Sequence, residues 1–208
     1  MELQYYGANA LKLSTKKSTI FIDPASDITS LSVDTKKANT ILVTQPTLQP
    51  SSTDGVFFID GPGEYEFEDY SIKGIAAQPH TAASGDKSAT MYWINSGDAR
   101  ILVTGHIDAK LSEEQLEAIG VVDVVIIPVG GGGYTLDSVG ATAVVTAVEP
   151  KLIVPVHAGD DGFKYDVPQA EIDLFVKESG IPTTEEAVEK LKFKSFPEQM
   201  TIQLVNKS

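Results

Sequence analysis

The stretch ILVTQPTLQPSSTD, residues 41–54, begins like a buried strand and then changes into a polar loop. Its first three residues are apolar and two of them are β-branched, which favours a strand that ends at Thr44. Prolines follow at positions 46 and 50, and proline lacks the N–H group through which a strand pairs, so the strand cannot continue. A loop therefore begins at the tip of the strand, where enzymes often hold catalytic groups. This loop has amide and hydroxyl side chains but no histidine, and its first carboxylate is Asp54.

Length, charge and composition restrict the classes of protein to which the chain can belong. With 208 residues, 42% of them hydrophobic, residues 1–208 are predicted to form a single domain with a substantial core. The net charge is −13 and the 16 Lys and Arg residues are scattered, which argues against nucleic-acid binding because that function needs a basic face. The chain has no cysteine, so disulfides, thiolate catalysis and cysteine zinc sites are excluded.

The sequence also predicts where the protein is found. No apolar run approaches the roughly 18 residues of a membrane span. The N-terminus lacks the basic and apolar regions of a signal peptide. We therefore expect a cytoplasmic protein that does not contact membranes, and a homo-oligomer is compatible with this composition.

The order of predicted elements indicates the fold class. Apolar runs separated by turn signals predict strands at 3–6, 10–13, 19–22, 40–44, 56–59, 65–67, 71–76, 89–94 and 100–103. Strands at 122–128 and 151–156 then alternate with helices, the first from a capping box at Ser112 to Gly120, the others at 135–148 and about 168–179. A short helix near 185–190 and a strand pair, 192–195 with 200–205, complete the chain. This order predicts an α/β (α+β) fold in which two sheets pack face to face with helices outside.

Five segments resemble a known family. They are YYGANALKL (5–13), TIFIDP (19–24), GPGEYE (61–66), IPVGGGGYTLD (127–137) and IVPVH (153–157). In this order and at this spacing they are similar to the metallo-β-lactamase-fold hydrolases, and most of all to a branch of small Zn-dependent hydrolases related to ascorbate lactonases. The resemblance covers nearly the whole chain and implies an αββα four-layer sandwich.

The same resemblance explains what is missing from the loop after Thr44. In the family, this loop carries His-x-His-x-Asp-His, whose side chains bind two metals and position the attacking water. The corresponding positions here are Gln45, Thr47, Gln49 and Pro50, and Ala8 replaces a further family histidine. Amide and hydroxyl oxygens are weak zinc ligands and a proline side chain offers none. Without metal, nothing in the loop lowers the pKa of a bound water toward 7, so the two-metal mechanism is not available.

The three histidines of the chain all fall where the family keeps active-site residues. His157 matches the final metal ligand, His106 takes the place of the bridging aspartate, and His80 matches a histidine near the metal centre. One hypothesis is a single zinc site of three imidazoles with an open fourth position, which is a known catalytic geometry. The other is that these are relic histidines, hydrogen-bonded to backbone or water in a pocket that binds no metal. In both cases we expect the three to converge on one cleft that faces residues 45–50.

Other polar residues are weaker candidates. Asp23 matches the family aspartate of TIFIDP and is expected to cap the loop from below, whereas Asp108 lies near His106 in sequence but matches no ligand position. Gly130–Gly133 lacks the Lys-Ser/Thr of a phosphate-binding loop and is better explained as a close backbone turn. Asp160–Asp161 could supply carboxylates to a pocket, but such pairs more often form a solvated turn.

Two functions follow from these residues. The leading hypothesis is a non-catalytic or strongly altered member of the family that needs no cofactor and binds a small ligand or a protein partner in the inherited cleft. The alternative is a mononuclear zinc-dependent hydrolase that uses His80, His106 and His157. Fold analogy alone does not decide between them.

Overall fold

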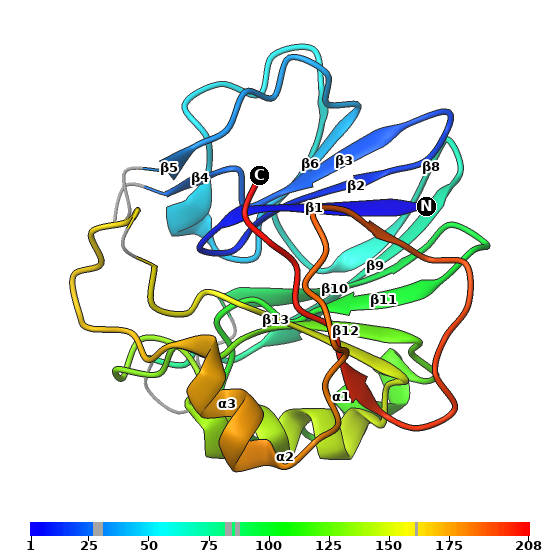
Figure 1. The fold of residues 1–208 in the computed structure, drawn as a ribbon. Helices are drawn as coiled ribbons and strands as arrows, with labels where there is room; N and C mark the ends of the chain where they lie inside the picture. Colours follow the sequence, from blue (N-terminus) through cyan, green and yellow to red (C-terminus); the bar gives the residue numbers. More distant parts are fainter. Residues whose placement is uncertain (27–30, 82–84, 86–87, 161) are drawn as a thin grey trace.

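The chain forms two mixed β-sheets that pack face to face, with helices on one outer side (Figure 1). The computed structural model describes residues 1–26, 31–81, 85, 88–160 and 162–208. The first sheet has the strand order β14-β1-β2-β3-β6-β7, formed by β1 (Glu2–Gly7), β2 (Ala10–Ser14), β3 (Thr19–Ile22), β6 (Thr40–Leu42), β7 (Phe57–Ile59) and β14 (Leu191–Lys192). Two short strands, β4 (Ala25–Ser26) and β5 (Leu31–Ser32), pair beside it.

The second sheet has the order β15-β13-β12-β11-β10-β9-β8. Its strands are β8 (Gly63–Phe67), β9 (Tyr70–Ala77), β10 (Ala89–Asn95), β11 (Arg100–Val103), β12 (Val124–Pro128), β13 (Leu152–Val156) and β15 (Thr201–Ile202). Every residue of β12 and β13 is buried, as expected for parallel strands that are covered on both faces. β11, β12 and β13 run parallel, so their carboxyl ends reach the same edge of the sheet.

The sandwich has one core between the sheets and a second core beneath the helices. The first core is built from apolar residues of both sheets, such as Leu11, Ile22, Tyr92 and Val154. The second lies between the seven-stranded sheet and the helices α1 (Glu113–Ile119), α2 (Ser138–Val148) and α3 (Ile172–Ser179), which all lie on that side (Figure 1). The sandwich predicted from the sequence is confirmed. The outer face of the six-stranded sheet packs against residues of the 33–58 region, which contain the 3-10 helix η1 (Pro46–Leu48).

Hydrogen bonds near the helix ends determine where each helix begins or ends. The predicted capping box is present at α1, where Ser112 accepts from the Gln115 N–H, and Gly120 ends the helix. α2 starts at Ser138 rather than 135, because Asp137 caps it and the Thr135 N–H bonds back to Gly131 in a turn. α3 starts at Ile172 rather than 168, because the Ala170 N–H donates to Gly130 and its carbonyl accepts from Gly159.

Two predictions about the end of the chain are wrong. Residues 185–190 form no helix, because the Val188 N–H donates to the Leu204 carbonyl and the Val188 carbonyl accepts from Asn206, so this backbone is already paired with the C-terminal segment. The last two strands do not pair with each other. β14 joins β1 in one sheet and β15 joins β13 in the other, so the C-terminal region connects both sheets.

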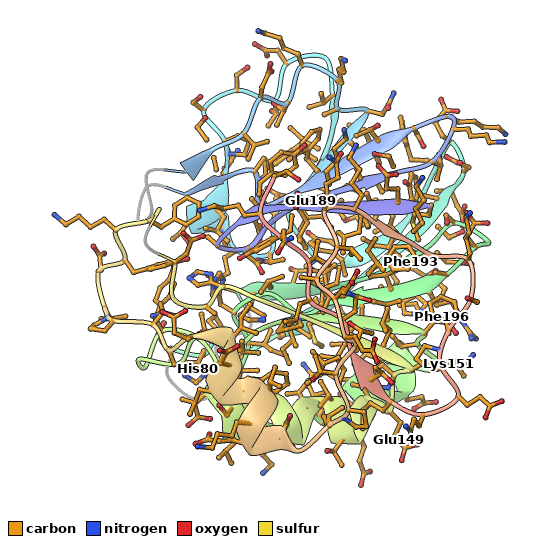
Figure 2. The ribbon with its side chains drawn as sticks, viewed as in Figure 1. His80, Glu149, Lys151, Glu189, Phe193 and Phe196 are labelled. Atoms are coloured by element: carbon orange, nitrogen blue, oxygen red, sulfur yellow. The ribbon has the colours of Figure 1, made fainter. Side chains whose placement is uncertain are left out.

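A charged cluster fixes the amino ends of the parallel strands. The buried carboxylate of Asp123 accepts from Arg100 Nε at 2.8 Å and from Arg100 Nη2 at 2.9 Å, and Lys151 Nζ lies 3.4 Å away. The Lys151 ammonium also lies over the Phe196 ring, 5.6 Å from its centroid (Figure 2).

None of the helices in the described part of the chain is both long and apolar enough to cross a lipid bilayer.

Candidate functional site

His106 and His157 meet at the carboxyl edge of the seven-stranded sheet. His157 directly follows β13, and His106 follows β11 after Thr104 and Gly105. His106 Nε2 lies 2.9 Å from His157 Nδ1, within hydrogen-bond distance, and the two rings are nearly perpendicular at 88°. Both side chains are buried, with 3% and 2% of their surface exposed.

This hydrogen bond determines what the outer nitrogens can do. A neutral imidazole has one donor and one acceptor nitrogen, so one ring donates in the shared bond and the other accepts. One outer nitrogen of the pair, His106 Nδ1 or His157 Nε2, is therefore a donor and the other is an acceptor. Both are buried, and neither has a hydrogen-bond partner among the described residues. Burial lowers the pKa of His157 and, with the nearby charge of His80, lowers the pKa of His106 to about 4, so the pair is neutral near pH 7.

His80, labelled in Figure 2, follows β9 and lies next to His106. Its backbone N–H donates to the His106 carbonyl at 2.9 Å, and the Asp108 N–H donates to the Gln78 carbonyl at 2.9 Å. These bonds join the two segments as a short antiparallel bridge. His80 Nδ1 is buried without a partner in the described structure. The structure therefore brings together all three histidines that the sequence singled out.

Two tyrosines cover the histidine pair. The Tyr134 ring lies 5.2 Å from the His106 ring and 5.6 Å from the His157 ring, and the Tyr165 ring lies 5.2 Å from the His157 ring. Both tyrosines are half-buried, and Tyr165 Oη has no partner within the described residues. Burial raises the pKa of both phenols, so they are neutral. Sequence reasoning did not select them. Tyr134 lies in the IPVGGGGYTLD segment, but nothing in the sequence around Tyr165 indicates its position.

Hydrogen bonds to Asp23 hold the start of the loop that follows β6. Its carboxylate accepts from the Thr44 N–H at 2.7 Å, from the Thr44 hydroxyl at 2.6 Å and from the Asn9 side-chain amide. Burial raises the Asp23 pKa to about 6, even though these hydrogen bonds act in the opposite direction. Asp23 thus caps the loop as predicted. Thr44 in turn packs against Gly105, where a Cβ would lie 2.6 Å from Thr44 Cβ, so the loop begins next to His106.

The loop itself presents no metal ligand to the histidines. Residues 46–48 form η1, Leu48 is buried with 3% exposed surface, and Thr47 and Gln49 are exposed. Gln45 is half-buried at the start of η1 and makes no side-chain capping bond. The turn of η1 and the burial of Leu48 therefore determine the orientation of the neutral side chains at the family's ligand positions.

The residues present do not fit the family's metal centre. A zinc ion needs nitrogen ligands at about 2.0–2.1 Å. The facing nitrogens of His106 and His157 are bonded to each other at 2.9 Å, which is closer than the about 3.3 Å between two nitrogens that share one tetrahedral zinc. In the described residues, no group of three or more His, Asp or Glu side chains has the arrangement of a metal site. A metal shared by the three histidines would require the pair to separate.

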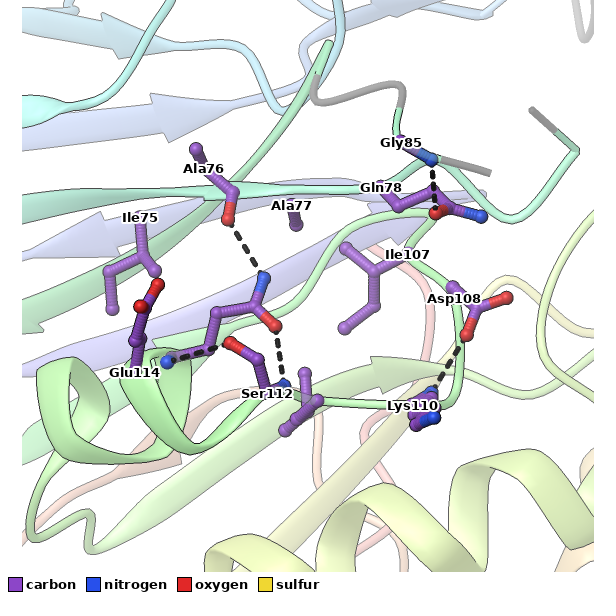
Figure 3. A pocket seen from close by; sticks show the side chains of 12 residues that line it. Ile75, Ala76, Ala77, Gln78, Gly85, Ile107, Asp108, Lys110, Ser112 and Glu114 are labelled. Atoms are coloured by element: carbon purple, nitrogen blue, oxygen red, sulfur yellow. Dashed lines mark hydrogen bonds between the residues drawn. The ribbon is translucent and has the colours of Figure 1, made fainter. Parts of the chain in front are cut away.

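Asp108 lies in a different pocket. This cavity of about 410 Å³ is bounded by the end of β9, residues 107–112 and the start of α1 (Figure 3). Asp108 Oδ1 accepts from the Lys110 N–H at 2.8 Å, and Gln115 bridges the Ser112 N–H and the Ala76 carbonyl (Figure 3). Asp160 pairs with Lys207 and does not contact the histidines, while Asp161 lies outside the described residues.

Comparison with known proteins agrees with this architecture. Residues 2–157 match the family model of the beta-lactamase superfamily domain. None of the curated protein sequences matches the chain significantly. Among solved structures, a proposed Zn-dependent hydrolase of the metallo-β-lactamase superfamily from Thermotoga maritima has a TM-score of 0.74 and 21% identity, covering 99% of this chain and 98% of that one.

Two further structures share the fold. The metallo hydrolase Igni18 from Ignicoccus hospitalis has a TM-score of 0.60 and 18% identity, over 86% of this chain and 90% of its own. The isothiocyanate hydrolase from Delia radicum gut bacteria has a TM-score of 0.66 and 13% identity, over 94% of this chain and 100% of its own. At these identities the likeness concerns the fold alone.

Proposed function

Because this chain belongs to the β-lactamase superfamily and has the metallo-β-lactamase-type sandwich fold, we propose that it is a ligand-binding member that does not use two-metal hydrolysis. The observation that carries the proposal is the hydrogen bond between His106 and His157. It occupies the nitrogens that face each other at the carboxyl edge of the sheet, where family members bind metal. The loop at 45–50 adds no histidine or carboxylate that could replace them.

The chemistry around the histidine pair supports a small polar ligand. Five buried polar atoms around it lack partners among the described residues: Asn9 Oδ1, His80 Nδ1, His106 Nδ1, His157 Nε2 and Tyr165 Oη. Each such atom costs about 1–3 kcal/mol if it stays unpaired. A ligand, or ordered water that a ligand displaces, would satisfy them. The half-buried rings of Tyr134 and Tyr165 provide apolar surface beside these polar atoms.

The test is metal content together with turnover. Protein purified without a histidine tag is analysed for bound metals and assayed against lactone, β-lactam and phosphodiester substrates with added zinc or manganese. We expect far less than one metal per chain and no turnover above a His157→Ala control. A small-molecule library screened by thermal shift should then give ligands whose effect is lost in His157→Ala.

The competing function is a mononuclear zinc hydrolase. It would be established by about one zinc per chain, with turnover that His80→Ala, His106→Ala and His157→Ala each abolish. These are the three residues that each have one buried nitrogen without a partner among the described residues, so this outcome would identify them as the zinc ligands.

A further inference from the structure

Lys207 lies close to Asp160 and Phe163, which come a few residues after His157 in sequence. Its ammonium contacts both carboxylate oxygens of Asp160, at 2.7 Å and 2.6 Å, and lies over the Phe163 ring at 4.6 Å from the centroid. A carboxylate beneath an ammonium and an aromatic face beside it are the two groups that bind an organic ammonium most favourably. The C-terminal side chain therefore sits in a complete ammonium site.

Contacts that do not involve Lys207 hold Asp160 and Phe163 in place; these two residues and their surroundings are called the corner below. The Gly162 N–H donates to Asp160 Oδ1 at 2.7 Å, and the Phe163 N–H donates to the Asp160 carbonyl at 3.0 Å. The Phe163 ring packs so closely on Gly7 that a Cβ there would lie 2.1 Å from it. Both walls of the site are therefore held by contacts other than the ion pair. Burial alone would raise the pKa of Asp160, but the bonds from Lys207 and Gly162 lower it, so the carboxylate is charged.

A series of aromatic rings connects Asp160 and Phe163 with the histidine pair. The Phe163 ring lies 6.1 Å from the Tyr165 ring, which in turn lies 5.2 Å from the His157 ring. A molecule whose ammonium replaced that of Lys207 could extend along Tyr165 toward the unpartnered nitrogen of His157. An ammonium ligand also fits the charge of this region, because Asp23 and Asp166 are near Tyr134, and Asp160 is near Tyr165.

Lys207 is held loosely enough to be replaced. Its side chain is 36% exposed, and an ion pair of this kind is weak and screened by salt. The tail stays attached without the ammonium, because the Ser208 N–H donates to the Tyr5 carbonyl at 2.8 Å and Lys207 forms a bridge with Tyr5. Displacement would therefore move one side chain and leave the fold unchanged.

We propose that the corner formed by Asp160 and Phe163 is a binding site for alkylammonium groups, which Lys207 of the same chain occupies until a ligand takes its place. This inference deepens the proposed function, on which it rests, by naming the chemical class of the ligand. The ammonium can come from a free amine or from a lysine side chain of another protein, and both present the same group to the site.

The test uses n-butylammonium chloride, which has the length of a lysine side chain, at constant ionic strength. Binding is followed by NMR at the backbone amides of Gly162 and Phe163. We expect saturable shifts in Lys207→Ala, with affinity at least about twofold higher than in wild type, because in wild type the Lys207 ammonium competes for the same site from within the chain. Uncharged n-butanol should cause no saturable shift, and Lys164→Ala, in the same segment, should behave like wild type.

Removal of the Asp160 charge is the decisive test of the proposal. Adding Asp160→Asn to Lys207→Ala should abolish binding, and Lys207→Gln serves as a second vacated variant if the alanine variant folds poorly. Absence of saturable binding in both variants that lack the Lys207 ammonium, or binding that persists without the Asp160 charge, would overturn the site.

A blocked Gly-Lys-Gly peptide distinguishes the two sources of the ammonium group. Stronger binding than n-butylammonium favours a protein lysine, and weaker binding favours a free amine. None of these results depends on metal content or turnover, so failure here is distinguishable from failure of the proposed function.

Discussion

The Tyr5 hydroxyl accepts a hydrogen bond from the backbone N–H of His157 at 3.2 Å, across 152 positions of the chain. The same hydroxyl donates to the Ala8 carbonyl at 3.1 Å. Tyr5 belongs to β1 in one sheet, and His157 follows β13 in the other. This one hydroxyl therefore joins the turn after β1 to the histidine pair and connects the two sheets at this point.

Replacing Tyr5 by Phe should reduce stability through this link. The substitution keeps the ring but leaves the buried His157 N–H without its acceptor, so we expect a loss of about 1–2 kcal/mol in the free energy of unfolding. Urea unfolding measures the change. Tyr6→Phe, on the opposite face of the same strand, is the control and should stay within about 0.5 kcal/mol of wild type. Equal effects in the two variants would show that the Tyr5 hydroxyl is not a structural link.

Chelation should not affect stability. The fold has cores on both faces of the seven-stranded sheet, and the arrangement of the histidines does not fit a metal ion. We expect the same melting temperature with and without EDTA. A metal present at a hundredfold excess over its dissociation constant would stabilise the protein by about 2.7 kcal/mol. A drop of several degrees with chelator that zinc reverses would therefore contradict this prediction.

Asp23→Asn should make stability more sensitive to acid. The Asp23 pKa is raised from 3.8 to about 6, so its contribution to stability is full below 3.8 and is lost as the pH rises through 6. The His106 pKa is lowered from 6.5 to about 4, so its contribution is present above 6.5 and is lost as the pH falls toward 4. In wild type the two effects oppose each other between pH 4 and 6, and the variant retains only the second.

Urea unfolding at a series of pH values between 7 and 4.5 measures this difference. Asp23→Asn should lose free energy of unfolding more steeply than wild type as the pH falls. Asp34→Asn, at an exposed carboxylate, is the matched control and should follow the wild-type curve. Parallel curves for wild type and Asp23→Asn would rule out a raised Asp23 pKa.

Arg100→Lys should weaken the charged cluster around Asp123. Lysine keeps the charge but loses the paired bonds from Nε and Nη2, so we expect a loss of about 1 kcal/mol at pH 7, because the Arg100 side chain is 37% exposed. The bonds from Arg100 lower the Asp123 pKa from 3.8 to about 2, so this stabilisation is lost as the pH falls through that range. Acid unfolding should therefore begin at higher pH in the variant, and an unchanged midpoint would contradict this.

Local sequence signals predicted most of the fold. The continuous apolar runs at β12 and β13 and the capping box at Ser112 each specify an element with little help from distant residues. The predicted helix at 185–190 was wrong because pairing of Val188 with the C-terminal segment overrides helix propensity. Such pairing depends on residues far apart in the chain, which local patterns do not encode.

The candidate site was predictable only in part. The resemblance selected all three histidines and the loop without metal ligands, and the structure places the histidines together. It could not show that His106 and His157 bond to each other, since that depends on where two strand ends meet and on side-chain rotamers. Tyr165 was missed for a similar reason, because it reaches His157 from a segment without regular structure.

The backbone of His157 has a consequence for how its imidazole can be removed. Its φ angle is +48°, in the left-handed region, where a residue with a Cβ is strained by about 1 kcal/mol and glycine or asparagine is tolerated more easily. Alanine at this position keeps the backbone strain, whereas asparagine relieves part of it. A comparison of His157→Ala with His157→Asn therefore separates the loss of the imidazole from the cost of the backbone conformation.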